Sequence, residues 1–161
     1  MFSYRQVVPL GSDPQESVRY KRSRFSTRLP SERLYTRSHC WIAPAGPELW
    51  RVGFTKFATR MLGELVECGF EVKRGDPVHV GQVIGWIEGF KAMSDLYCVV
   101  SGIFEGTNPD LENHIAPVHS DPYGKGWLYL VTGSPEAQAV DVQGYVGILD
   151  ATIDKIQSNP E

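Results

Sequence analysis

The chain has 161 residues, of which 42% are apolar, and this size suits one domain with a single hydrophobic core. Its formal net charge of -3 excludes a general electrostatic attraction to nucleic acid or to an anionic membrane. No apolar stretch is long enough to cross a bilayer and the first residues lack the apolar run of a secretory signal, so we expect a cytosolic protein.

Residues 1–32 differ in composition from the rest of the chain, and we expect a basic, irregular N-terminal arm before a domain at residues 33–161. Residues that break periodic structure are scattered through it: Pro9, Gly11, Ser12, Pro14 and Pro30. Its cations cluster without matching acids: Arg19, Lys21, Arg22, Arg24 and Arg28. A mitochondrial transit peptide and a docking arm for an acidic partner stay open, although Asp13 and Glu16 argue against the former.

Strand patterns begin at Leu34. Thr55 is placed to cap a short helix that Gly63 ends, because apolar residues recur between them at a spacing of three to four. The turn residues Pro44 to Pro47 predict that two of the strands around them form a hairpin. The strands expected in this part are residues 34–36, 41–42, 48–53 and 64–68.

Two strands of similar length, residues 83–88 and 94–100, flank the short segment 89–93. This pattern predicts a second hairpin with Lys91 near its tip. A modifying enzyme needs an amine that projects into solvent from a rigidly held bend, so that an added arm swings about a fixed base. A turn lysine that is merely solvated has the same local pattern, so the pattern alone does not decide.

The last part of the chain contains further strands at residues 103–106 and 127–131, with Asn108 placed to cap a short helical turn. A C-terminal helix is expected because its apolar residues mark one helical face: Val142, Tyr145, Val146, Leu149, Ile153 and Ile156.

Several segments resemble glycine cleavage system H proteins in order and spacing. Residues 88–95, Glu-Gly-Phe-Lys-Ala-Met-Ser-Asp, resemble the lipoylation hairpin of that family, which typically reads Glu-Ser-Val-Lys-Ala-x-Ser-Asp. Residues 38–41 resemble its Ser-His-Glu-Trp. The similarity covers about residues 34–157. Residues 52–55 resemble the family's Val-Gly-Ile-Thr, and residues 62–66 resemble its Leu-Gly-Glu. Residues 100–102 with Asn108 resemble the strand after the lysine, and residues 121–128 resemble Pro-Tyr-x-x-Gly-Trp.

The resemblance implies a mainly β fold, a lipoyl/biotinyl hammerhead in which two small sheets form a flattened barrel-sandwich hybrid, with short flanking helices and a C-terminal helix. It implies lipoic acid as the cofactor, covalently attached to Lys91. Biotin carriers usually have methionine on both sides of the lysine, whereas Phe90 and Ala92 stand here. The resemblance assigns the recognition hairpin to Glu88, Gly89, Phe90 and Ala92, and the cleft for the arm to Ser38, Cys40, Phe57 and Asp95.

The same resemblance implies a bacterial carrier without catalytic residues, whose lipoyl arm shuttles a bound intermediate between partner enzymes. Lipoate alternates between disulfide and dithiol, and tethering raises its effective concentration at each partner. The expected partners include a lipoate ligase or the lipoyl synthesis machinery, and we expect a monomer. An enzyme is not expected, because no Ser/His/Asp group, paired acids or phosphate-binding loop stands out.

Departures from the family pattern favour another cargo than the aminomethyl group. Cys40 stands where the family has glutamate, and the loss of this carboxylate removes a charge-assisted hydrogen bond to an amine-bearing arm. Phe57 stands where the family usually has His or Tyr. Together with Gly89 and Phe90, these changes resemble the H-protein-like lipoate-binding proteins of bacterial sulfur oxidation, which work with a heterodisulfide-reductase-like complex. Two alternatives stay open: an H protein serving the P, T and L proteins, and an unmodified interaction module.

Cysteines and histidines indicate no metal site or disulfide framework, because the three cysteines lack a CxxC spacing and the four histidines are scattered. Cys68 and Cys98 are interpreted as small buried residues on strands. Cys40 has a second interpretation, a thiol that exchanges with the arm. His39 and His114 are expected to be structural or solvent-facing.

Overall fold

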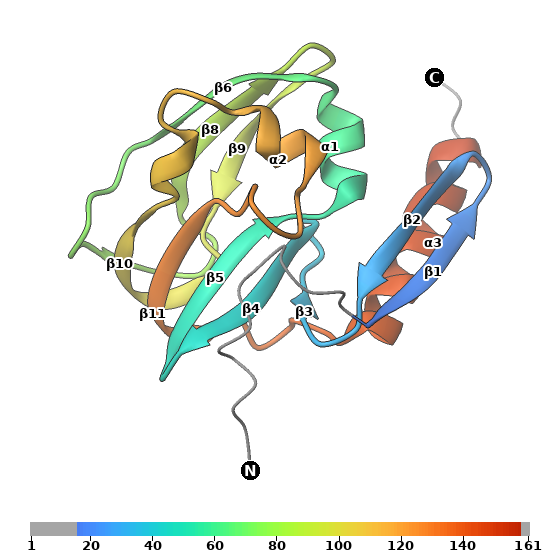
Figure 1. Cartoon of the computed structure of the whole chain (residues 1–161). Coiled ribbons are helices and arrows are strands. Elements are labelled where there is room, and N and C mark those ends of the chain that lie inside the picture. Colours follow the sequence, from blue (N-terminus) through green and yellow to red (C-terminus); the bar gives the residue numbers. More distant parts are fainter. Residues whose placement is uncertain (1–15, 159–161) are drawn as a thin grey trace.

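The computed structural model describes residues 16–158 and shows a mainly β chain with three sheets and few helices (Figure 1). The helices are α1 (Lys56–Leu62), the 3-10 turn η2 (Pro109–Leu111), α2 (Ala116–Ser120) and α3 (Val142–Ser158). The strands are β1 (Ser17–Arg22), β2 (Phe25–Pro30), β3 (Leu34–Tyr35), β4 (Cys40–Gly46), β5 (Leu49–Phe54), β6 (Leu65–Phe70), β7 (Pro77–Val78), β8 (Val83–Gly89), β9 (Met93–Tyr97), β10 (Val100–Thr107) and β11 (Tyr129–Pro135). None of the helices in the described part is long and apolar enough to span a membrane.

Two of the sheets supply the main core. The six-stranded sheet has the order β3-β4-β5-β11-β10-β7, and the three-stranded sheet has the order β6-β8-β9. Fully buried side chains from both sheets pack into one cluster, including Ile42, Val52, Ile84, Ile87, Phe104 and Val131. Burying each such side chain stabilises the fold by about 1.5–3 kcal/mol, so the core holds the hairpin strand β8 firmly in place.

Residues 17–30 form a β-hairpin, and the expectation of an irregular arm is wrong for this stretch. Tyr20, Phe25 and Leu29 are buried in a second core cluster together with residues of α3, which supplies the hydrophobic burial that composition did not reveal. Pro30 stands at the last position of β2, where it does not interrupt the ladder. The other expected breakers lie outside the described residues, and the domain boundary at residue 33 stays a prediction.

Most of the expected elements are present close to their predicted bounds. Thr55 caps α1, since its side-chain oxygen accepts a hydrogen bond from the Ala58 amide at 3.3 Å, and Asn108 caps η2 through the Asp110 amide at 3.0 Å. Helix α3 buries Val142, Tyr145, Leu149 and Ile153 as expected. Ile156 is 45% exposed, because it follows the last α3 residue that reaches the second core cluster.

Candidate lysine modification site

Lys91 lies in the turn between β8 and β9, as the sequence predicts. The ladder of this hairpin ends with Glu88 opposite Met93, and the Gly89 amide donates to the Ala92 carbonyl at 2.9 Å. The turn therefore spans Gly89 to Ala92, and the Lys91 side chain is exposed. Within residues 16–158, its amine forms no hydrogen bond or ion pair.

The segment after α1 braces this turn. The Lys91 amide donates to the Leu62 carbonyl and the Phe90 amide donates to the Glu64 carbonyl, each at 2.9 Å. The Leu62 carbonyl is in the last turn of α1, where no partner within the helix is available, and Glu64 follows the Gly63 cap. The two bonds fix the backbone under the lysine while its side chain stays in solvent, which is the arrangement needed by a swinging arm.

Two glycines permit this close approach. A Cβ on Gly89 would lie 2.2 Å from the Leu62 carbonyl oxygen, so any side chain there would separate the two segments. Gly63 has a φ of +78°, in the left-handed region, and a Cβ there would lie 2.9 Å from Cγ of Lys91. Residues 62–64 were not among the predicted site residues, although the Leu-Gly-Glu similarity and the helix-ending glycine marked this segment.

The segments that form and brace the lysine turn carry exposed apolar side chains. Phe90 is 78% exposed, Met93 65% and Met61 50%, whereas Glu88 is only partly exposed. Phe90 and Met93 belong to the hairpin itself, and Met61 comes from the last turn of α1. A ligase or partner enzyme that binds the turn would therefore meet exposed apolar side chains on the same segments as the amine.

Cys40 lies in the core and does not line an open cleft. Its side chain packs in the main core cluster, and burial raises the pKa of the Cys40 thiol to about 12. Thiol exchange requires the thiolate, which is scarce near neutral pH at such a pKa. Cys98 is also buried and its thiol donates to the Val100 carbonyl, whereas Cys68 is only partly buried.

We expect only one of the three thiols to react in the folded protein. Cys68 should react with a soluble disulfide reagent, while Cys40 and Cys98 should react only after unfolding, because both are buried. The absorbance of the released thiolate counts the reacting groups, and the Cys68→Ser variant should release none before unfolding. Rapid reaction of Cys40 in the folded chain would contradict the burial described here.

Phe57 and His39 form a closed aromatic group at the start of α1. Phe57 is buried, with its ring centroid 4.7 Å from that of His39 and 5.4 Å from that of Phe25. His39 Nδ1 lies 2.8 Å from the Tyr145 hydroxyl, which also lies 2.8 Å from the Thr55 hydroxyl. Burial lowers the pKa of His39 to about 4, so the imidazole is neutral near pH 7. The roles of Thr55 and Tyr145 here were not predicted.

This neutral histidine predicts a loss of stability in acid. The pKa of His39 is about 4 in the folded chain against 6.5 for an unperturbed histidine, so the stability present above pH 6.5 is lost as pH falls toward 4. Between pH 7 and pH 4.5 the wild-type chain should lose about 2 kcal/mol more unfolding free energy than the His39→Gln variant. Urea unfolding at both pH values measures the difference, and equal losses would count against a neutral, partly buried imidazole.

The predicted cleft residues are only partly gathered. Ser38 is exposed, its hydroxyl 2.9 Å from that of Thr36, beside His39 and hence near Phe57. Lys91 bonds to Leu62 at the opposite end of α1. Leu62 is five residues after Phe57, which corresponds to a helix rise of about 7.5 Å. Asp95 is exposed on β9 opposite Trp86, and its carboxylate bonds to none of the other candidates within the described range. That range also holds no group of three or more potential ligands for a metal ion.

The paired sheets and the braced turn define a class of small, mainly β domains that present one lysine at a hairpin tip. The family model for the glycine cleavage H-protein matches residues 33–146. The chain therefore belongs to the glycine cleavage H-protein family. Glycine cleavage H proteins carry a lipoyl-lysine cofactor.

Individual relatives agree with this assignment. The glycine cleavage system H protein of Alteromonas mediterranea is 34% identical over 127 residues, which cover 77% of this chain and 98% of the relative. The H protein of Mycobacterium tuberculosis is 41% identical over 100 residues, covering 62% and 74% of the two chains. The crystal structure of the H protein from Mycobacterium marinum superposes with a TM-score of 0.67 at 33% identity, covering 74% of this chain and 97% of that one.

Proposed function

We propose that this chain is the lipoyl carrier of a glycine cleavage system, with lipoic acid joined in amide linkage to Nζ of Lys91. The exposed amine on a turn braced by the carbonyls of Leu62 and Glu64 carries the proposal. No ion pair within the described residues has to break before the amine can react. When bound, lipoate supplies a dithiolane that alternates between disulfide and dithiol by thiol exchange.

The chain's own residues contribute position and not catalysis. Gly63 and Gly89 allow the turn to pack against the end of α1, so the arm has a fixed base. Phe90, Met93 and Met61 offer apolar area to whichever enzyme receives the arm. The P, T and L proteins of glycine cleavage are then the partner enzymes, and a lipoate ligase or the lipoyl synthesis machinery loads the lysine.

The sulfur-oxidation interpretation becomes the second candidate. The named relatives are glycine cleavage H proteins, and they support a glycine cleavage carrier over a sulfur-oxidation carrier. One observation still favours a different cargo: Cys40 supplies no carboxylate and is buried, and Phe57 is buried against His39, so neither side chain can pair with an amine. Both candidates use the same arm on Lys91 and differ in the partner enzymes.

Carbon dioxide exchange separates the two candidates. The lipoylated chain is incubated with glycine decarboxylase, glycine and labelled bicarbonate, with the H protein of Alteromonas mediterranea as the positive control. We expect exchange of label into glycine that depends on this chain. Absence of exchange beside an active control would overturn the glycine cleavage assignment and favour the sulfur-oxidation candidate.

A further inference from the structure

The β1–β2 hairpin is an addition to the part of the chain that matches the family. It ends at Pro30, whereas the family match begins at residue 33. The relative from Alteromonas mediterranea is matched over 98% of its length by 77% of this chain, so this chain has segments that the relative lacks. The hairpin is therefore a candidate for a property beyond carrying the arm.

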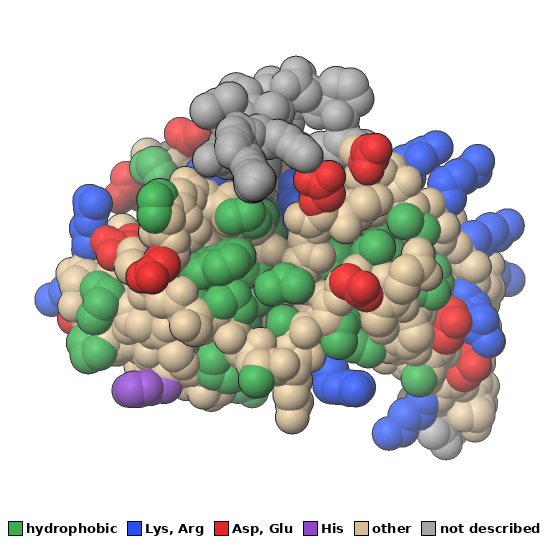
Figure 2. All heavy atoms as spheres, turned by 90° about the horizontal axis from the view of Figure 1, so that it is seen from below, with side chains coloured by type: hydrophobic (Ala, Val, Ile, Leu, Met, Phe, Trp, Pro, Cys, Tyr) green, Lys and Arg blue, Asp and Glu red, His purple; other side chains and the backbone are tan. Residues whose placement is uncertain are grey.

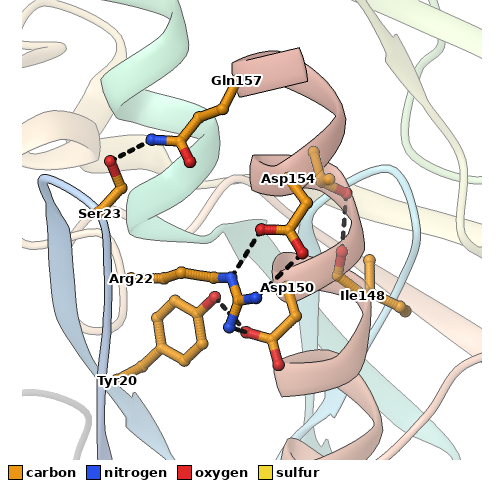
Figure 3. A network of polar contacts seen from close by, with 8 residues as sticks. Tyr20, Arg22, Ser23, Ile148, Asp150, Asp154 and Gln157 are labelled. Carbon is orange, nitrogen blue, oxygen red and sulfur yellow. Dashed lines mark hydrogen bonds and ion pairs between the residues drawn. The ribbon is translucent and has the colours of Figure 1, made fainter.

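Contacts with α3 hold the hairpin in a fixed position. The Tyr20 hydroxyl donates to Asp150 at 2.8 Å, and the Arg22 guanidinium pairs with Asp154 at 2.9 Å and with Asp150 at 3.2 Å (Figure 3). Ser23, in the hairpin turn, bonds to Gln157 (Figure 3). Asp150 and Asp154 of α3 are therefore already paired with Tyr20 and Arg22, and neither carboxylate is available to the other cations of the hairpin.

The opposite side of the hairpin carries cations without acids. We call Arg19, Lys21 and Arg28 the basic face; all three are exposed, and they alternate along the strands with buried Tyr20 and Leu29. Arg19 lies directly opposite Arg28 in the ladder, a like-charge pair that destabilises a hairpin. No residue of the described chain forms an ion pair with the basic face. An anionic partner would remove this repulsion.

The hairpin that carries the basic face packs against α1, and the end of α1 contacts the lysine turn. Figure 2 shows Lys and Arg side chains gathered along the end formed by the hairpin and α3. The Arg60 guanidinium in the last turn of α1 lies 5.8 Å from the Phe25 ring of the hairpin, and Leu62 two residues further bonds to Lys91. Figure 1 likewise places α1 between this hairpin and the tip of β8 and β9. The basic face lies on the outer side of this hairpin, so a partner that docks there must reach past α1 to contact the arm.

Charge distribution favours an acidic protein surface over a polymer of phosphates or a membrane. Residues 17–30 contain five cations and no acid, whereas residues 31–158 contain ten cations and sixteen acids. An extended polyanion or an anionic bilayer would be repelled by the rest of the molecule. A folded protein can present a local acidic patch that meets only the hairpin.

We propose that the basic face docks an acidic surface of a partner enzyme that acts on the lipoyl arm. This inference rests on the proposed function, because it supposes that such enzymes exist for this chain. Docking by a rim of exposed charges raises the rate of productive encounter and depends on ionic strength. The lysine hairpin and the basic face then form two separate contacts with one partner.

The test compares two variants that remove the same charge. The first carries Arg19→Gln, Lys21→Gln and Arg28→Gln; the second, a control, carries Lys73→Gln, Arg74→Gln and Lys125→Gln, three exposed cations outside the hairpin. Each lipoylated chain is assayed as the substrate of purified P, T and L proteins at low and high salt. For at least one enzyme we expect the first variant to raise KM about tenfold at low salt with kcat unchanged, and the difference to vanish at high salt.

The outcomes separate this proposal from the proposed function. Turnover of the wild-type chain with the same KM for both variants would overturn the docking proposal alone. A wild-type chain that none of the three enzymes accepts, beside an active control H protein, would overturn the proposed function and the docking proposal together. Salt-dependent self-association that the first variant loses would assign the face to a second copy. Binding to duplex DNA or phosphatidylserine vesicles instead of the enzymes would also contradict the proposal.

Discussion

Replacing Lys91 with arginine abolishes lipoyl loading and leaves the fold intact. The guanidinium keeps the positive charge and a similar length, yet a ligase cannot form the amide on it at neutral pH, because arginine is not deprotonated in proteins. The exposed side chain contributes little packing, so the unfolding free energy should stay within about 0.5 kcal/mol of wild type. Intact mass after incubation with lipoate ligase, ATP and lipoate measures the loading.

Lys125→Arg is the matched control for this experiment. Lys125 is another exposed loop lysine; its amide donates to the Asp121 carboxylate and its carbonyl accepts from Asn108, but it does not stand at the tip of a β-hairpin. The control should be loaded as fully as the wild-type chain and should support the same rate of carbon dioxide exchange. Loading of the Lys91→Arg chain would show that another residue is the attachment site.

The second large effect is expected from Gly89→Ala. The added Cβ would lie 2.2 Å from the Leu62 carbonyl oxygen, and this oxygen belongs to the backbone, so the turn and the end of α1 must move apart. This shift weakens the bond from the Lys91 amide to the same carbonyl. We expect the unfolding free energy to fall by about 1–3 kcal/mol, and the rate of loading by the ligase to fall with it.

A glycine in open space provides the comparison. Gly147 lies within α3 and an added Cβ would meet no atom within 4 Å, so Gly147→Ala should raise the unfolding free energy by up to about 1 kcal/mol. Urea unfolding and the initial rate of lipoylation are measured for both variants. If Gly89→Ala matches the wild-type chain in both, the brace does not matter for presenting the lysine.

Local sequence patterns predicted the elements that depend on neighbours along the chain. The cap at Thr55, the turn at Lys91 and the buried stripe of α3 all follow from spacing within one short segment. Contacts between distant segments were missed, because no local pattern encodes them. The brace joins Lys91 to Leu62, and Tyr20 of the hairpin bonds to Asp150, 130 residues away.

Cys40 and Phe57 were predicted to line the cleft for the arm, but both are buried in the structure. The identity of Cys40 marks a lost carboxylate, but only the packing of β4 against the core shows that its thiol is enclosed. Phe57 likewise faces Phe25, a residue of the stretch that was expected to be irregular. Because the β1–β2 hairpin was not predicted, the contact that buries Phe57 against Phe25 was not predicted either.

Peptide mapping of the wild-type chain tests the attachment site most directly. After loading with lipoate ligase and lipoate, the protein is digested and each lysine-containing peptide is analysed by tandem mass spectrometry. One lipoyl group on the ε-amine of the exposed turn lysine, residue 91, is the expected result. A chain that remains unmodified while a relative's H protein is loaded in parallel, or one modified at a different lysine, would contradict the carrier assignment.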